Sequence, residues 1–96
     1  MVGFLILGAA GCGSSETFPV GVAATGDPLF AELCASCHGF SGEGDDTRGA
    51  PAIAGLSSAA SIQGTVRNGS GDMPKFAQSV VSSQELADII AYIATL

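Results

Sequence analysis

Two cysteines three positions apart, followed at once by the only histidine, constrain this chain more than any other feature of its sequence. The run reads Cys34-Ala35-Ser36-Cys37-His38. Residues i and i+3 lie on one face of a helix, so both sulfurs can reach the same edge of a planar group. C-x-x-C-H is the pattern of covalent c-type haem attachment, and the adjacent imidazole can turn a ring nitrogen toward the iron.

Three other uses of these cysteines remain open at this point, although each is disfavoured. A structural zinc site needs four ligands, and beyond the run the chain offers only Cys12 and no second histidine. A thioredoxin-like redox motif is expected beside a βαβ pattern, and no β-rich segments flank this run. A disulfide between Cys34 and Cys37 would be strained on a helix.

Size and charge limit the function classes. The 96 residues allow one domain, and a chain this short with 14 Gly and no Trp can bury only a modest core unaided. A buried haem would supply the missing apolar mass. The net charge of −6, with 9 acidic and 3 basic residues, leaves no basic patch to neutralise phosphates. We therefore expect no nucleic-acid binding.

The N-terminus has the pattern of an export signal. Val2 to Ala10 is apolar but shorter than the roughly 20 residues that span a bilayer. The small residues before Cys12 resemble a bacterial lipobox, which predicts cleavage before Cys12 and lipidation of its thiol. An ordinary signal peptide is the alternative. We expect residues 1–11 to be the signal, 12–26 a lipidated flexible tether and 27–96 the folded domain, exported and held on the periplasmic side of a bacterial membrane.

Helical patterns fill most of the predicted domain. Asp27-Pro28 is typical of a helix start, with an acidic N-cap and proline at the first position. A helical segment is expected over roughly residues 58–67, with Ile62 and Val66 facing the cofactor. Ser82 and Glu85 fit a capping box for a last helix. The apolar stripes are Phe30, Leu33, Cys34 and Cys37 in the first helix, and Leu86, Ile89, Ile90, Ile93 and Leu96 in the last.

Four motifs in order resemble a known family. They are Gly26-x-x-x-Phe30, Cys34-x-x-Cys37-His38-Gly39, Pro51-Ala52-Ile53-Ala54-Gly55 and the glycine-rich segment that ends in Met73-Pro74. Together they resemble a class I c-type cytochrome. The resemblance implies an all-α cytochrome c fold, with three to five helices wrapped around one covalently bound haem c. It also implies that Gly26 lets the first and last helices cross closely, and that Phe30 meets Tyr92 there.

The resemblance also implies a set of site residues. The Pro51 carbonyl would accept a hydrogen bond from His38 Nδ1, Arg48 would pair with a haem propionate, and Met73 would be the sixth iron ligand. We expect Ile53, Val66 and Phe76 to contact the haem as well.

The number of possible iron ligands in the chain agrees with that ligand set. Bis-histidine ligation within one chain is excluded by the single histidine, and the other methionine, Met1, belongs to the predicted signal. If the protein supplies both axial ligands, they are His38 and Met73. A His/Met site raises the reduction potential of a cytochrome c.

With both axial positions occupied, the expected function is one-electron carriage between redox protein partners, by a monomer that is not an enzyme. A small apolar rim of Ala35, Ala50 and Phe76 is the expected docking surface. Two alternatives remain: a peroxidase-like haem enzyme in which Met73 dissociates, and an electron-relay subunit of a larger oxidoreductase.

Overall fold

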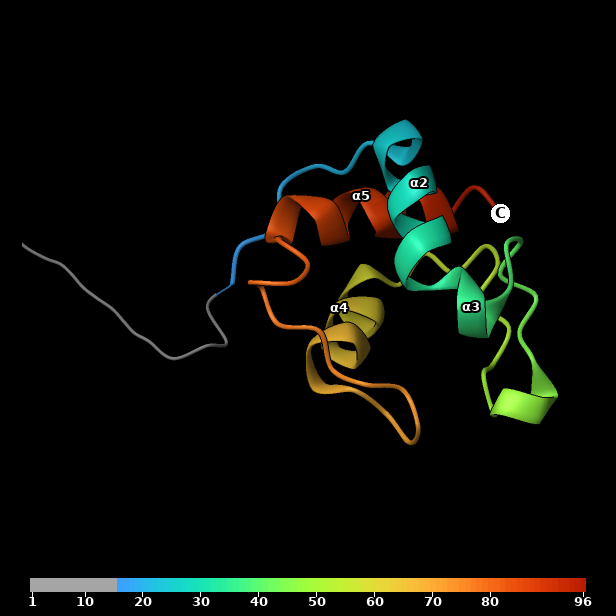
Figure 1. The fold of residues 1–96 in the computed structure, drawn as a ribbon. Coiled ribbons are helices and arrows are strands. Elements are labelled where there is room, and N and C mark those ends of the chain that lie inside the picture. The colour runs from blue at the N-terminus through green and yellow to red at the C-terminus, as the bar shows by residue number, and fades with distance from the viewer. Residues whose placement is uncertain (1–15) are drawn as a thin grey trace, which may run out of the picture.

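A computed structural model describes residues 16–96, which form a helical domain (Figure 1). The elements are α2 (Ala23–Leu33), α3 (Ala35–His38), the 3-10 helix η2 (Asp46–Arg48), α4 (Ala59–Asn68) and α5 (Ser83–Ile93). Pairing of β type within residues 16–96 is limited to two isolated bridges. The predicted all-α class is confirmed. The predicted signal peptide and the lipidation of Cys12 lie outside the described residues.

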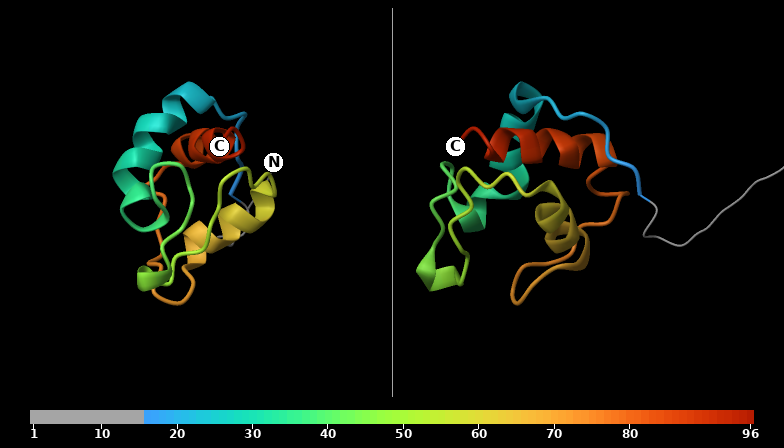
Figure 2. Two further views of the ribbon diagram at one scale, coloured as in Figure 1. Left: turned by 90° about the vertical axis from the view of Figure 1, so that its right-hand side faces the viewer. Right: turned by 180° about the vertical axis from the view of Figure 1, so that it is seen from behind.

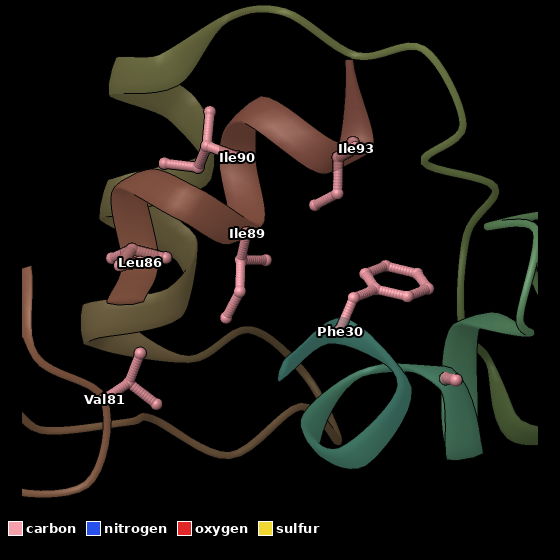
Figure 3. Packing of buried hydrophobic residues seen from close by; sticks show 7 residues of the cluster. Phe30, Val81, Leu86, Ile89, Ile90 and Ile93 are labelled. Carbon is pink, nitrogen blue, oxygen red and sulfur yellow. The ribbon is translucent and has the colours of Figure 1, made fainter. Parts of the chain in front are cut away.

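The last helix carries most of the core. The Ser82 hydroxyl accepts from Glu85 N at 3.1 Å and the Glu85 carboxylate accepts from Ser82 N at 2.8 Å, so the predicted capping box is present. The buried side chains of the core are Phe30, Ala35, Val81, Leu86, Ile89, Ile90 and Ile93. Figure 3 shows Ile89 and Ile93 on the side of α5 where Phe30 lies, whereas Ile90 lies on the opposite side. The stripe residues within α5, which are Leu86, Ile89, Ile90 and Ile93, are all buried as predicted, and Leu96 lies beyond the end of the helix.

The first and last helices cross in close contact at a glycine (Figures 1 and 2). A Cβ placed on Gly26 would lie 2.0 Å from the Asp88 carbonyl oxygen, so only glycine fits against this part of α5. Nearby, the rings of Phe30 and Tyr92 have centroids 5.4 Å apart and are tilted by 55°. That separation lies in the range of favourable aromatic pairs. Both contacts implied by the resemblance are present.

The predicted start of the first helix at Asp27 is wrong. Helix α2 begins at Ala23, and Pro28 lies inside it rather than at its first position. The extra turn is closed by bonds from Thr25 N and Gly26 N to Val22 O, at 3.1 and 3.0 Å. Packing of Gly26 on α5 holds this turn in place, and tertiary contact thereby overrides the local signal of Asp-Pro.

The part of the predicted tether that the structure describes is not free chain. Residues 16–22, blue in Figure 1, lead along α5 to the start of α2. Val20 O accepts from Gln84 Nε2 at 3.1 Å, and Val22 N donates to the buried Asp88 carboxylate at 2.8 Å. Phe18 packs against the core. The folded unit therefore starts before residue 27, because polar groups on α5 bind the backbone of this segment.

Helix α4 matches its prediction to within a residue at each end, since it spans Ala59–Asn68. Long loops precede and follow it, and these loops carry several of the predicted site residues. None of the helices within residues 16–96 is long and apolar enough to span a bilayer.

Candidate functional site

Cys34, Cys37 and His38 lie where α2 gives way to α3. The predicted continuous helix is interrupted at Cys34, whose φ of −118° departs from the helical value and redirects the chain. The Cys34 carbonyl nevertheless accepts from Cys37 N at 3.2 Å and from His38 N at 2.9 Å. This single turn keeps the three side chains close to one another, and all three line the same cavity.

The His38 ring is buried, with 8% of the residue exposed, and is oriented by the chain itself. Its Nδ1 lies 2.9 Å from the Pro51 carbonyl oxygen, as the resemblance implied. A carbonyl can only accept, so Nδ1 is the donor and carries the proton. In a neutral imidazole this leaves the lone pair on Nε2, which is the state that binds a metal.

The position of the Pro51 carbonyl is fixed by the loop that precedes it. Ile53 N and Ala54 N both donate to Gly42 O, at 2.8 and 3.0 Å, and Gly44 N donates to His38 O at 2.8 Å. These bonds fold the Pro51 segment back onto the chain that leaves α3. The geometry at His38 therefore depends on backbone bonds on both sides of the ring.

Met73 is presented by a closed loop, residues 69–76, which we call the methionine loop. Ser70 N donates to Met73 O at 3.1 Å and Met73 N to Ser70 O at 2.8 Å. Gly69 begins the loop with a φ of +77°, and a Cβ there would lie 2.8 Å from Met73 O. Such a backbone is open only to glycine without strain. The thioether of Met73 is thus carried on a loop of defined shape.

A single cavity of about 960 Å³ joins these segments. This volume is at the upper end of the usual range for ligand sites. Its apolar walls include Ile62, Leu86, Ile89 and Ile93. The cofactor contacts predicted from the sequence all line it: Cys34, Cys37, His38, Arg48, Pro51, Ile53, Val66, Met73 and Phe76. Two thiols that could attach a haem, and an imidazole and a thioether that could ligate its iron, lie on one apolar cavity, so the residues fit haem c.

The environment of Cys34 opposes a redox-active role for the cysteine pair. Burial, and then the neighbouring Cys37, raise the pKa of the Cys34 thiol to about 11. Redox-active C-x-x-C pairs depend instead on a lowered thiol pKa, because the thiolate is the nucleophile. Within residues 16–96 no group of three or more His, Cys, Asp and Glu side chains is placed to hold a metal ion. A structural zinc site would need four ligands.

Arg48 lies at the mouth of the cavity, at the end of η2. Its side chain is 60% exposed, and its Nε is 3.4 Å from the Asp45 carboxylate. The Asp45 carboxylate also accepts from the hydroxyl and the backbone N–H of Thr47, at 2.6 and 3.0 Å. These bonds, the hydroxyl first, hold the pKa of Asp45 below its usual value. The pairing of Arg48 with a propionate stays a prediction.

The predicted apolar docking rim is wrong in one member. Ala35 is only 5% exposed and belongs to the core cluster, because the turn at Cys34 buries the first residue of α3. Ala50 and Phe76 are half-buried. Large exposed apolar side chains occur elsewhere in the described chain, and Phe40, directly after Gly39, is 74% exposed.

Sequence reasoning missed Arg67, which makes the densest set of polar contacts in the described chain. It forms a two-pronged ion pair with Glu16, and its Nη1 donates to two backbone carbonyls. Its side chain is only 15% exposed. Two features of the sequence could have drawn attention to Arg67. It is one of only three basic residues, and it directly follows Val66, which was predicted to face the cofactor.

Comparison with known proteins found one matching family and one similar protein. Residues 21–93 match the protein family described as cytochrome C oxidase, cbb3-type, subunit III. The chain is also 38% identical over 73 residues to a protein of Corynebacterium diphtheriae named "Cytochrome bc1 complex cytochrome c subunit". That alignment covers 73% of this chain and 26% of the relative, so the chain spans about a quarter of the relative's length.

Proposed function

Because this chain belongs to the family of cytochrome c oxidase, cbb3-type, subunit III, and is therefore a c-type cytochrome that transfers electrons rather than an enzyme, we propose that it carries single electrons through one haem c. In this proposal Cys34 and Cys37 form the thioether links, and His38 and Met73 are the axial ligands. When bound, the haem supplies a one-electron iron couple.

One observation carries the proposal: a single apolar cavity brings together both thiols, the imidazole and the thioether. His38 and Met73 come from segments that are distant in sequence and separated by α4. The hydrogen bond between His38 Nδ1 and the Pro51 carbonyl leaves Nε2 as the metal-binding nitrogen. No other histidine exists in the sequence to compete for the iron.

The chain itself contributes ligation, burial and rigidity. Ile53, Ile62 and Val66 line the cavity with apolar side chains, which would shield a bound haem from water and tune its potential together with the axial ligands. The closed methionine loop and the fixed His38 ring limit the movement of both donors. A site whose ligands move little suits repeated electron exchange. We assign Arg48, at the cavity mouth, to a haem propionate.

A second candidate is an electron-relay subunit of a larger complex. The matched family is named for an oxidase subunit, and the relative is named as a subunit of the bc1 complex. Its redox partners would then be permanent neighbours rather than diffusing proteins. Sedimentation of native membrane extracts distinguishes the two cases, because a free carrier sediments as the small monomer and a subunit as part of a heavy particle.

We place the protein on the periplasmic side of a membrane, anchored by lipid on Cys12. Glu16 is bound to the domain through Arg67, so only residues 13–15 separate the anchor from a fixed point. Four residue steps span at most about 14 Å, and the domain would stay close to the lipid surface. Metabolic labelling with a radioactive fatty acid tests this, and loss of label in Cys12→Ser supports it.

The decisive experiment is a visible spectrum of the mature domain expressed with haem-maturation machinery. We expect a low-spin spectrum, and the ferric protein should show the charge-transfer band of a methionine–iron bond. Met73→Ala should lose that band and bind carbon monoxide rapidly when reduced, whereas the wild type should be inert. Lys75→Ala is the matched control in the same segment. A colourless wild-type protein, or a band that survives in Met73→Ala, would refute the proposal.

A further inference from the structure

One arginine holds the far end of the methionine loop. Arg67 Nη1 donates to Phe76 O and to Val81 O, each at 2.9 Å. The preceding residue, Val66, accepts from Phe76 N at 2.8 Å. Two adjacent residues of α4 therefore bind both backbone polar groups of Phe76, the third residue after Met73. The near end is held separately, by Gly69 N donating to Thr65 O at 2.7 Å.

Glu16 fixes the orientation of that arginine. Arg67 Nε and Nη2 donate to the two carboxylate oxygens of Glu16, and the Ser83 hydroxyl donates to the same carboxylate at 2.6 Å. A planar guanidinium bound on two prongs cannot rotate, so its third nitrogen, Nη1, is directed at the two carbonyls. The Phe18 ring, 6.0 Å from the guanidinium carbon, lies against the same group.

The contacts form a unit because they are shielded from water. The side chains of Arg67 and Glu16 are 15% and 10% exposed. Removal of the carboxylate would leave a largely buried cation without its partner, and such a loss is strongly unfavourable. The guanidinium would then turn toward solvent, and Phe76 O and Val81 O would lose their donor together.

We propose that Glu16 and Arg67 are positioning residues for Met73: they clamp Phe76 and so set how readily the methionine loop opens. The inference rests on the proposed ligation by Met73. Opening of the methionine loop would carry the thioether away from the iron, so contacts that hold the loop closed also hold the sulfur in place. The clamp also ties the N-terminal segment to this loop, across 51 residues of sequence.

The test uses the haem-loaded ferric protein and imidazole, which binds iron only after the methionine has left. Glu16→Gln removes the charge at nearly constant shape, and Arg67→Lys keeps the charge but loses the fork. Both should increase the apparent imidazole affinity by about tenfold or more, because hydrogen bonds to a charged group are lost from the closed state only. Exchange of the Phe76 amide should accelerate by a similar factor.

Asp88→Asn is the matched control. Asp88 is a buried carboxylate that binds the same N-terminal segment through Val22 N, but it does not contact the methionine loop. This variant should lose global stability and yet keep its imidazole affinity within about twofold of the wild type, as expected for independent sites. A merely structural role of Glu16 would predict equal effects in both variants.

Each outcome bears on the proposal. Wild-type imidazole affinity in Glu16→Gln, or an equal increase in Asp88→Asn, overturns it. If Glu16→Gln does not fold, Ser83→Ala removes one bond to Glu16, and a smaller increase of about threefold is expected. If the wild-type protein lacks the methionine band, the proposed ligation fails. The clamp is then judged by Phe76 amide exchange alone, and unchanged exchange in Glu16→Gln refutes it.

Discussion

Replacing Gly26 with alanine should destabilise the domain by forcing α2 away from α5. A Cβ at this position would lie 2.0 Å from the Asp88 carbonyl oxygen, 2.5 Å from its carbonyl carbon and 2.9 Å from Ile89 N. All three atoms belong to the backbone of α5, so no side-chain rotation can relieve the clash. The helices themselves must separate, and the contact of Phe30 with Tyr92 loosens with them.

The magnitude follows from two opposing terms. Overpacking of a rigid site costs typically ~1–3 kcal/mol, and a backbone obstacle places Gly26→Ala at the upper end of that range. Alanine is intrinsically favoured over glycine inside a helix by ~1 kcal/mol, which offsets part of the cost. The net loss is therefore ~2 kcal/mol. For a domain of this size that loss lowers the melting temperature by roughly 8–16 °C.

Gly64 provides the matched control. It lies within α4, and a Cβ built on it would meet nothing within 4 Å. Gly64→Ala should therefore raise stability by ~0.5–1 kcal/mol through helix propensity alone. Guanidinium unfolding of the haem-loaded variants, followed by far-ultraviolet circular dichroism, measures both changes. Equal stability of Gly26→Ala and the wild type, or a comparable loss in Gly64→Ala, would refute the close-crossing argument.

Three further predictions concern single contacts. Ser82→Ala should cost ~1 kcal/mol in denaturant unfolding, because it removes one half of the capping box of α5. The hydrogen bond from Arg67, followed by the other contacts of Glu16, holds the pKa of this carboxyl below its usual value. Its contribution to stability is thus complete above the usual carboxyl pKa and is lost as the pH falls through the lowered one, which urea midpoints across the acid range can follow. A double-mutant cycle of Phe30→Leu and Tyr92→Leu should give a coupling of ~0.5–1.5 kcal/mol.

Controls separate these effects from general destabilisation. Ser79→Ala, an exposed serine just before α5, should be neutral beside Ser82→Ala. In the acid series, the difference between wild type and Glu16→Gln isolates Glu16 from the other carboxyls. A difference that does not change with pH would contradict the assignment. In the aromatic cycle, additive single effects would mean that the two rings do not interact.

Much of the site was predictable because its candidate residues occur in short sequence motifs. The Cys34-x-x-Cys37-His38 run, the single Met73 and the segment around Pro51 identified the residues that the fold gathers on one cavity. The last helix was equally predictable from the sequence. A capping box and a stripe of apolar residues are local patterns, and their consequences appear within a few residues of the chain.

Other features could not be found in local patterns. Asp27-Pro28 predicted a helix start that the packing of Gly26 on α5 moved to Ala23. Ala35 was expected on a surface rim, yet the turn at Cys34 directs it into the core. The sequence did not indicate that Glu16 binds Arg67, because a salt bridge across 51 residues has no signature in either segment.

The sequence alone therefore determined which groups are available for the proposed haem site: two thiols, one imidazole and one thioether, each in a short motif with its own local geometry. Tertiary structure decided how those groups are held: the close crossing at Gly26, the orientation of His38 by Pro51 and the clamp of Arg67 and Glu16 on the methionine loop. The physical reason is the distance along the sequence over which each interaction acts. Helix caps and attachment motifs act within one or two turns, whereas packing and buried ion pairs exist only after distant segments have met.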